Sequence, residues 1–270
     1  MDRNSPKISF VRILLAMSAL GLALPGYAGM VTANVFFNQT YTQTTSGVSF
    51  TGDYFLANGT MQTPTDFATV TLSYPGPSFV PMTVNGVDFS YQTGLFTDDT
   101  LFNNSFPTGS YDFQGDLVTQ ASISYTQALY DTMVPTLTAA SFNRLQNLDP
   151  TFSPTINFNL PGTATEFSTF NIYDTSGNLA YTTGPLANTI RTIVLPANIL
   201  LPNMQYRFDL DFSNQLAGTS MGVSTLQGFD VRTGGDFTTS AGSAVPEPTV
   251  LSLFAIGAAI FGLRRRSRFD

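Results

Sequence analysis

Apolar and polar residues alternate through most of the chain between its two uncharged, apolar ends. In the clearest example, segment 206–212, four large apolar residues alternate with three charged ones. Side chains two positions apart point to the same face of a β-strand, so this segment is predicted to be a strand with one buried face. Similar alternation, weaker in places, predicts strands at 31–37, 48–56, 67–74, 83–91, 111–113, 117–130, 156–160, 170–172, 179–181, 190–195, 228–233 and 237–239.

Turn residues separate these segments at short intervals. Asn85-Gly86 lies between two apolar stretches and predicts a β-hairpin, because both residues accept the positive φ of a tight turn. The run from Asp174 to Asn178 predicts a second reversal of the chain. We therefore expect an all-β fold, a β-sandwich passenger between two targeting segments.

The first 28 residues have the pattern of a secretory signal peptide. Three basic residues precede an uncharged apolar run from Ile13 to Leu24, and Pro25 ends it. Gly26-Tyr27-Ala28 then places small residues where a signal peptidase cleaves. The expected cut falls between Ala28 and Gly29, after export by the Sec machinery.

The last 26 residues, 245–270, have three parts. Pro246 and Pro248 flank Glu247 and favour an extended stub, because proline cannot continue a helix. Residues 249–263 then predict a short transmembrane helix, whose fourteen uncharged residues from Val250 to Leu263 would span ~21 Å of the ~30 Å hydrocarbon core. A basic cluster follows and keeps its end of the helix on the cytoplasmic side: Arg264, Arg265 and Arg266.

This tail resembles the PEP-CTERM sorting signal, through Val245-Pro246-Glu247-Pro248, the apolar run and the arginine cluster. The resemblance implies that an exosortase, a membrane cysteine protease, removes the tail and passes the protein to the cell surface or extracellular matrix. It also implies a Gram-negative bacterium that makes exopolysaccharide, and only transient contact with the inner membrane. A permanent membrane anchor is the alternative for the tail.

Charge and composition narrow the function of the passenger. Between Gly29 and Ala244 there are fourteen Asp and one Glu against four Arg and no Lys, an excess of eleven negative charges. Such a surface is a poor partner for nucleic acid. Cys, His and Trp are absent from the chain, which excludes disulfides, thiol nucleophiles and histidine-dependent catalysis.

The C-terminal half resembles a fibronectin type III or immunoglobulin-like sandwich. Leu200, Pro202 and Tyr206 have the spacing of a tyrosine corner, in which the tyrosine hydroxyl binds a nearby backbone group. A plain strand start is the alternative. We expect a β-rich region at 29–132 and this sandwich at 133–240, and the sequence leaves open whether they form separate domains.

Two groups of carboxylates are the candidates for chemistry in the passenger. Asp209 and Asp211 share a strand face with Arg207, and we expect that face to be solvated. Asp98-Asp99 could contribute to a calcium loop but lacks the EF-hand spacing. No passenger carboxylate stands out as buried, so we expect no catalytic residue, metal site or cofactor.

The expected function is that of a non-enzymatic surface or matrix protein with a structural or adhesive role in exopolysaccharide or biofilm. One alternative is a carbohydrate-binding module, which a shallow aromatic pocket would favour. A second alternative is a carboxylate-only glycosidase, which needs two acids in a cleft at a separation of ~5–10 Å.

Overall fold

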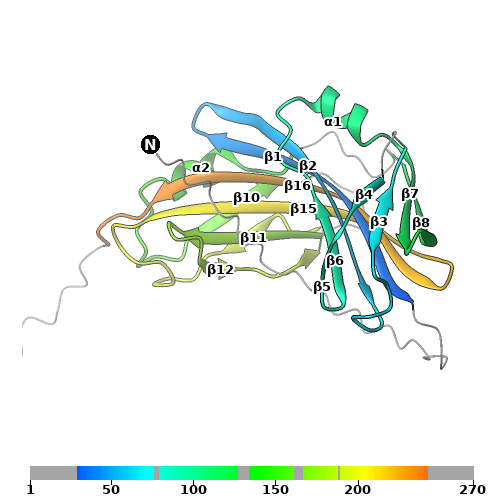
Figure 1. The fold of residues 1–270 in the computed structure, drawn as a ribbon. Coiled ribbons are helices and arrows are strands. Elements are labelled where there is room, and N and C mark those ends of the chain that lie inside the picture. Colours follow the sequence, from blue (N-terminus) through cyan, green and yellow to red (C-terminus); the bar gives the residue numbers. More distant parts are fainter. Residues whose placement is uncertain (1–28, 76–78, 127–133, 161–166, 188, 243–270) are drawn as a thin grey trace, which may run out of the picture.

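The computed structural model describes residues 29–75, 79–126, 134–160, 167–187 and 189–242, and they form a mostly β structure with two short helices (Figure 1). The first part of the chain contains β1 Met30–Thr44, β2 Gly47–Met61, β3 Val70–Ser73, β4 Phe79–Pro81, β5 Thr83–Asn85, β6 Asp88–Gln92, α1 Asp99–Ser105, β7 Gly109–Gly115 and β8 Val118–Tyr125. The second part contains β9 Thr136–Leu137, α2 Ala139–Leu145, β10 Thr155–Asn159, β11 Phe167–Asp174, β12 Leu179–Thr182, β13 Leu186–Ala187, β14 Thr192–Val194, β15 Gln205–Ser220 and β16 Val223–Thr238.

A nine-stranded sheet runs through both parts of the chain. Its order is β12-β11-β15-β16-β1-β2-β6-β5, with β13 paired to β11. All these pairs are antiparallel except β1 with β16, which run parallel over eleven residue pairs, from Thr32 with Ser224 to Thr42 with Gly234. The parallel pair therefore joins the beginning of the passenger to its end within one sheet.

Two smaller layers cover the same face of this sheet. The sheet β4-β3-β7-β8 and helix α1 pack at one end of the long strands, and the sheet β14-β10-β9 and helix α2 pack at the other (Figure 1). Phe229 and Val231 of β16 belong to the first core, and Phe237 belongs to the second. These residues lie at alternate positions of one strand and so share one face. The opposite face of β16 carries Asp230 and Arg232.

Several predicted elements are confirmed. The hairpin at Asn85-Gly86 joins β5 to β6, with Asn85 opposite Asp88 and Gly86 at a φ of 63°. The Asp174–Asn178 reversal joins β11 to β12 and is closed by a 2.9 Å bond from the Asp174 amide to the Asn178 carbonyl. In segment 206–212 the apolar residues face the core, as the alternation predicts: Tyr206, Phe208, Leu210 and Phe212.

The local structure differs from the alternation pattern at three places. The predicted strands at 228–233 and 237–239 are not separate, because both fall in the sixteen-residue β16, which ends at Thr238. Asp98 and Asp99 do not lie in a loop alone, because Asp99 starts helix α1 and Asp98 caps it by accepting a 3.1 Å bond from the Leu101 amide. The alternation also gave no sign of α2, whose cap is Thr138.

Candidate functional site

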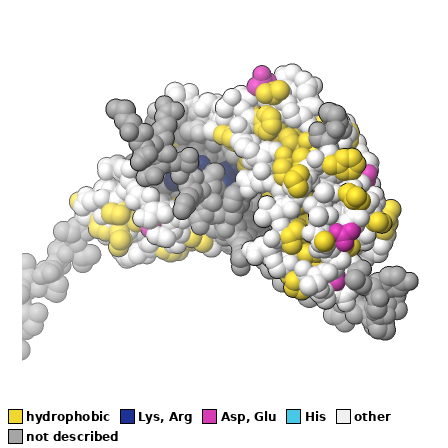
Figure 2. All heavy atoms as spheres, viewed as in Figure 1, with side chains coloured by type: hydrophobic (Ala, Val, Ile, Leu, Met, Phe, Trp, Pro, Cys, Tyr) yellow, Lys and Arg dark blue, Asp and Glu magenta, His cyan; other side chains and the backbone are white. Residues whose placement is uncertain are grey.

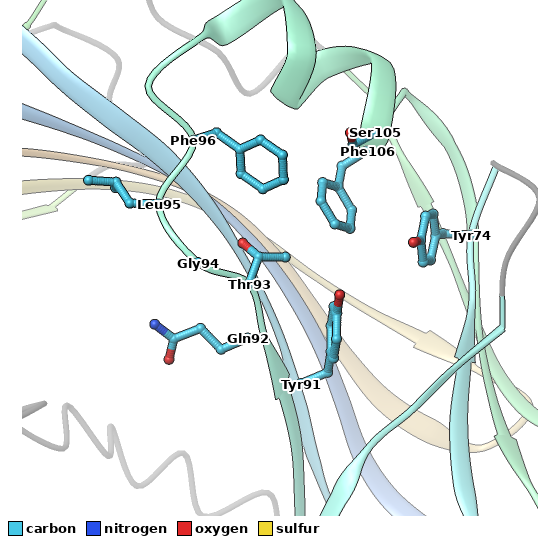
Figure 3. A pocket seen from close by; sticks show the side chains of 9 residues that line it. All are labelled: Tyr74, Tyr91, Gln92, Thr93, Gly94, Leu95, Phe96, Ser105 and Phe106. Atoms are coloured by element: carbon cyan, nitrogen blue, oxygen red, sulfur yellow. The ribbon is translucent and has the colours of Figure 1, made fainter.

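An open pocket lined by aromatic rings lies between β6, helix α1 and the end of β3 (Figure 3). Its volume is about 540 Å³, within the range of small-molecule sites. Rings and polar groups share the lining: Tyr74, Tyr91, Gln92, Thr93, Gly94, Leu95, Phe96, Ser105 and Phe106. Figure 3 shows the hydroxyl groups of Tyr74 and Tyr91 directed into the same space, beside the rings of Phe96 and Phe106.

The first core holds these rings in place. Phe106 stacks on Phe55 of β2 with ring centroids 4.6 Å apart, and it lies 5.1 Å from the Tyr74 ring. Phe102 of helix α1 packs against Phe37 of β1, with ring centroids 6.0 Å apart. Aromatic pairs at these separations add to the stabilisation that burial provides. Helix α1 is therefore fixed to the sheet by Phe102 and by Phe106, the residue at its C-cap.

The segment between β6 and α1 forms one wall of the pocket and runs along β2. Phe96 exchanges two backbone hydrogen bonds with Asp53, of 2.7 and 2.8 Å. A Cβ added at Gly52 would lie 2.5 Å from the Phe96 carbonyl oxygen and 2.6 Å from the Leu95 side chain. Glycine at position 52 is thus what lets this segment approach the sheet so closely.

Asp53 is buried directly beneath this wall. Its residue exposure is 0%, and no donor among the described residues bonds either carboxylate oxygen in good geometry. Burial first, and the Asp99 carboxylate within hydrogen-bonding reach second, raise the pKa of Asp53 to about 7. The amide of Gln39 opposes the shift. The expectation that no passenger carboxylate is buried is therefore wrong.

The open face of the large sheet carries a second group of charged residues. Arg232 of β16 binds Asp211 at 2.5 Å and lies 3.8 Å from Asp209, which also accepts a 2.9 Å bond from Arg207. The side chain of Asp209 is only 8% exposed, so the prediction of a solvated face is wrong at this residue. Figure 2 shows basic side chains within a hollow of the molecule.

This charged group has its own hydrogen-bond partners. Asn171 and Thr169 of β11 donate to Asp211 at 3.1 and 3.2 Å, and Ser213 donates to Asp230. Burial raises the pKa of Asp209, while Arg232 and Arg207 oppose the shift. The carboxylates of Asp209 and Asp211 are thus compensated by two guanidinium groups, whereas no arginine in the described part of the chain pairs with the carboxylate of Asp53.

The predicted tyrosine corner forms a local hydrogen bond at the start of β15. The Tyr206 hydroxyl accepts a 2.9 Å bond from the Leu201 amide, and Leu200 is buried in the second core. Thr239 donates to the Leu201 carbonyl at 2.6 Å and so ties the same corner to the end of β16. These contacts position the long strands and provide no chemistry.

The targeting residues lie mostly outside the described residues. This applies to Ala28, to the predicted transmembrane helix 249–263, and to the whole of the predicted sorting tail: Val245, Pro246, Glu247, Pro248, Arg264, Arg265 and Arg266. Gly29, the predicted first residue of the mature chain, immediately precedes β1. Within the described ranges, neither helix is long and apolar enough to span a membrane.

Residues 244–266 match the model of the PEP-CTERM protein-sorting motif. The chain carries a PEP-CTERM sorting signal. The motif, as the tail resemblance predicted, marks the chain as an exported protein that an exosortase sorts to the cell envelope or surface. No curated protein matches the chain.

Sequence reasoning missed both the pocket and the buried aspartate. A signal for Asp53 was present, since it alternates with Phe55 and Ala57 and so shares their buried face. The pocket was harder to predict from the sequence than the burial of Asp53, because its four rings come from separate segments and alternation does not show that these segments meet.

Proposed function

We propose that the mature protein is a non-enzymatic surface protein that adheres to exopolysaccharide through the aromatic pocket. The observation that carries this proposal is the open pocket with Tyr74, Tyr91, Phe96 and Phe106 in its lining. The C–H faces of a sugar ring are apolar and pack on aromatic rings, while its hydroxyl groups need polar partners. Tyrosine hydroxyls, Thr93 and Gln92 supply such partners at the same place.

Electrostatics favour a neutral saccharide over an acidic one. The whole chain has a net charge of −7, and most of its positive residues lie in the two targeting ends. Asp53 lies beneath the wall of the pocket that contains Phe96, and Asp99 follows that wall three residues later in the chain. A uronate or sulfated sugar would meet repulsion there, whereas a neutral hexose polymer would not.

The arrangement of the Asp53 and Asp99 carboxyl groups supports binding more than hydrolysis. Glycosidases keep their two carboxyl groups ~5–10 Å apart so that the anomeric carbon fits between them. Asp53 and Asp99 lie within hydrogen-bonding reach of each other, and the Asp53 side chain is buried. A sugar in the aromatic pocket would therefore contact the rings and not the Asp53 carboxyl.

Sorting and fold type complete the proposal. We infer that the signal peptide is removed before Gly29, that the exosortase cuts near 245–248, and that the product is retained at the surface or in the matrix. The hydrogen bond between Tyr206 and the Leu201 amide supports an immunoglobulin or fibronectin III type for residues 133–240. The intact mass of the protein from its host, with and without the exosortase, tests the processing.

Binding to polysaccharide is tested with the protein released by its host. We expect retention of this protein in affinity electrophoresis through the host exopolysaccharide, and weaker retention of Tyr91→Ala by about tenfold, the effect of losing roughly 1.4 kcal/mol of contact. Tyr181→Ala is the matched control, since Tyr181 is also half-buried but packs against the second core. Equal retention of both variants, or no retention of the unchanged protein on any neutral glycan, would refute the proposal.

A further inference from the structure

Four oxygen-bearing side chains converge beside the start of helix α1. Asp53 comes from β2, Gln39 and Tyr41 come from β1, and Asp99 comes from the first turn of α1. Tyr41 donates a 3.3 Å bond to the Gln39 amide oxygen. Burial has the largest effect on the pKa of the Tyr41 hydroxyl and raises it, and the Asp53 and Asp99 charges raise it further. The group therefore contains two carboxylates and two neutral oxygens.

The state of Asp53 sets this group apart from an ordinary acidic cluster. Both of its carboxylate oxygens are buried, and within the described residues the nearby Gln39 amide does not complete a hydrogen bond to either, although buried carboxylates in proteins are normally paired or bound to a metal. Its nearest charged neighbour is a second carboxylate, which increases the cost of ionisation. A cation between the two carboxylates would remove both penalties at once.

The geometry also provides a route for an ion. Asp99 is exposed at the surface, whereas Asp53 lies beneath it. Asp99 can bind an arriving ion while that ion still keeps part of its water shell, and Asp53 then replaces water from below. Asp98 is excluded from this role, because its carboxylate caps α1 through the Leu101 amide.

We propose that Asp53 and Asp99, with the Gln39 side chain beside them, form a binding site for a divalent cation of the calcium type. Carboxylate and amide oxygens are the ligands that Ca²⁺ prefers, and its flexible coordination accepts an incomplete protein set completed by water. No three acidic, histidine or cysteine side chains converge within the described ranges, so the site depends partly on neutral ligands. That donor set corresponds to the weak affinity of extracellular modules, with a Kd of ~0.1–1 mM.

The site would act on the segment that precedes α1. The Phe96 backbone is hydrogen-bonded to the Asp53 backbone, and helix α1 begins three residues later, at Asp99. An ion that holds the Asp53 and Asp99 side chains together would fix this segment against β2. The cation site does not depend on the saccharide proposal, and its test needs no sugar.

Thermal unfolding of the full protein, with EDTA or with millimolar CaCl₂ near pH 8, tests the site. At about ten times the Kd, binding to the folded state raises Tm by roughly 3–5 °C for a domain of this size. Asp99→Asn should abolish this rise and still fold, because the residue is exposed. Asp98→Asn is the matched control, since asparagine also caps helices well and the rise should persist.

A second measurement uses the tyrosine beside the site. The chain has no tryptophan, so tyrosine alone sensitises bound Tb³⁺. Tb³⁺ luminescence should be displaced by Ca²⁺, and Tyr41→Phe should dim it while leaving the Ca²⁺ effect on Tm unchanged. Absence of any Tm rise with Ca²⁺, or a rise of equal size in Asp99→Asn and Asp53→Asn, would overturn the site. In the first case the pair shares a proton instead, and in the second the ion binds elsewhere.

Discussion

Asp209 and Asp53 are both buried in the nine-stranded sheet, but their electrostatic surroundings differ. Asp209 lies on the open face, where Arg207 and Arg232 approach its carboxylate. Asp53 lies on the covered face, where its charged neighbour is Asp99. A compensated carboxylate holds strands together, whereas an uncompensated one costs stability unless a proton or a cation reaches it. The difference explains why we place a ligand at Asp53 and assign a structural role to Asp209.

Removing the compensation at Asp209 should have the largest effect. Arg232→Met would leave Asp211 without its guanidinium and Asp209 with Arg207 alone. We expect a loss of about 3 kcal/mol in the free energy of unfolding, because an unpaired buried charge remains. Urea unfolding measures this loss.

The matched control for this change is Arg144→Met. Arg144 is exposed and donates to a neutral acceptor, the Thr155 carbonyl, at 2.7 Å. Its loss should cost under about 1 kcal/mol. If the two variants were equally destabilised, the ion pairs on the open face would contribute nothing beyond a surface arginine.

The second prediction concerns the cover over Asp53. Gly52→Ala places a methyl group against the Phe96 carbonyl and should cost about 1–3 kcal/mol by overpacking. As the 93–96 segment moves away from β2, water should reach Asp53 and lower its pKa toward the ordinary value. Urea unfolding across pH would detect both effects. Gly86→Ala is the control, because a methyl group there meets no atom and its cost comes from the positive φ alone. A pKa of Asp53 that stays near 7 would show that Asp99, not the cover, sets it.

The third prediction is a gain of stability. Asp53→Asn removes the uncompensated charge and keeps the shape, so at pH 8 with EDTA it should stabilise the protein by about 1–2 kcal/mol. The folded-state pKa of about 7 lies above the unfolded value, so the folded protein binds the extra proton. The unchanged protein should therefore lose stability as pH rises from about 4 through 7, and the variant should lose less.

Thermal unfolding between pH 5 and pH 8 measures this difference. The two proteins should be closest in Tm at pH 5, where Asp53 is protonated, and furthest apart at pH 8. Parallel pH profiles would mean that Asp53 is ionised throughout and has a partner after all.

The sequence predicts the surroundings of Asp209 better than those of Asp53. Alternation in β15 identifies the buried face of Phe208 and Leu210 and the charged face of Asp209, because both lie within one strand. The Asn85-Gly86 hairpin is equally local. Alternation with Phe55 and Ala57 indicates the face of Asp53, but the segment that covers it comes some forty residues later, and no local pattern contains that contact.

Long strands were also missed for a physical reason. Gly234 and Gly235 normally weaken a strand, so the pattern favoured two short strands in place of β16. In the structure, pairing with β1 and β15 on both sides keeps the backbone extended there. A Cβ at Gly235 would lie 2.7 Å from the Phe208 ring and 2.8 Å from the Gln43 carbonyl, so glycine serves close packing at this point. Tertiary contact overrides the local preference.

The smallest predicted effect concerns Asp230, which lies between the two extremes. Burial raises the pKa of Asp230, a hydrogen bond from Ser213 and the Arg232 charge oppose the shift, and the resulting pKa is about 6. Ser213→Ala should cost about 1 kcal/mol near pH 8, where the carboxylate is ionised and loses a donor. Near pH 5 the cost should shrink, because the protonated carboxyl needs that donor less. Urea unfolding at both pH values tests this, with Ser220→Ala on the same strand as control. An equal cost at both pH values would place Asp230 with Asp209, as a carboxylate kept ionised by arginine alone.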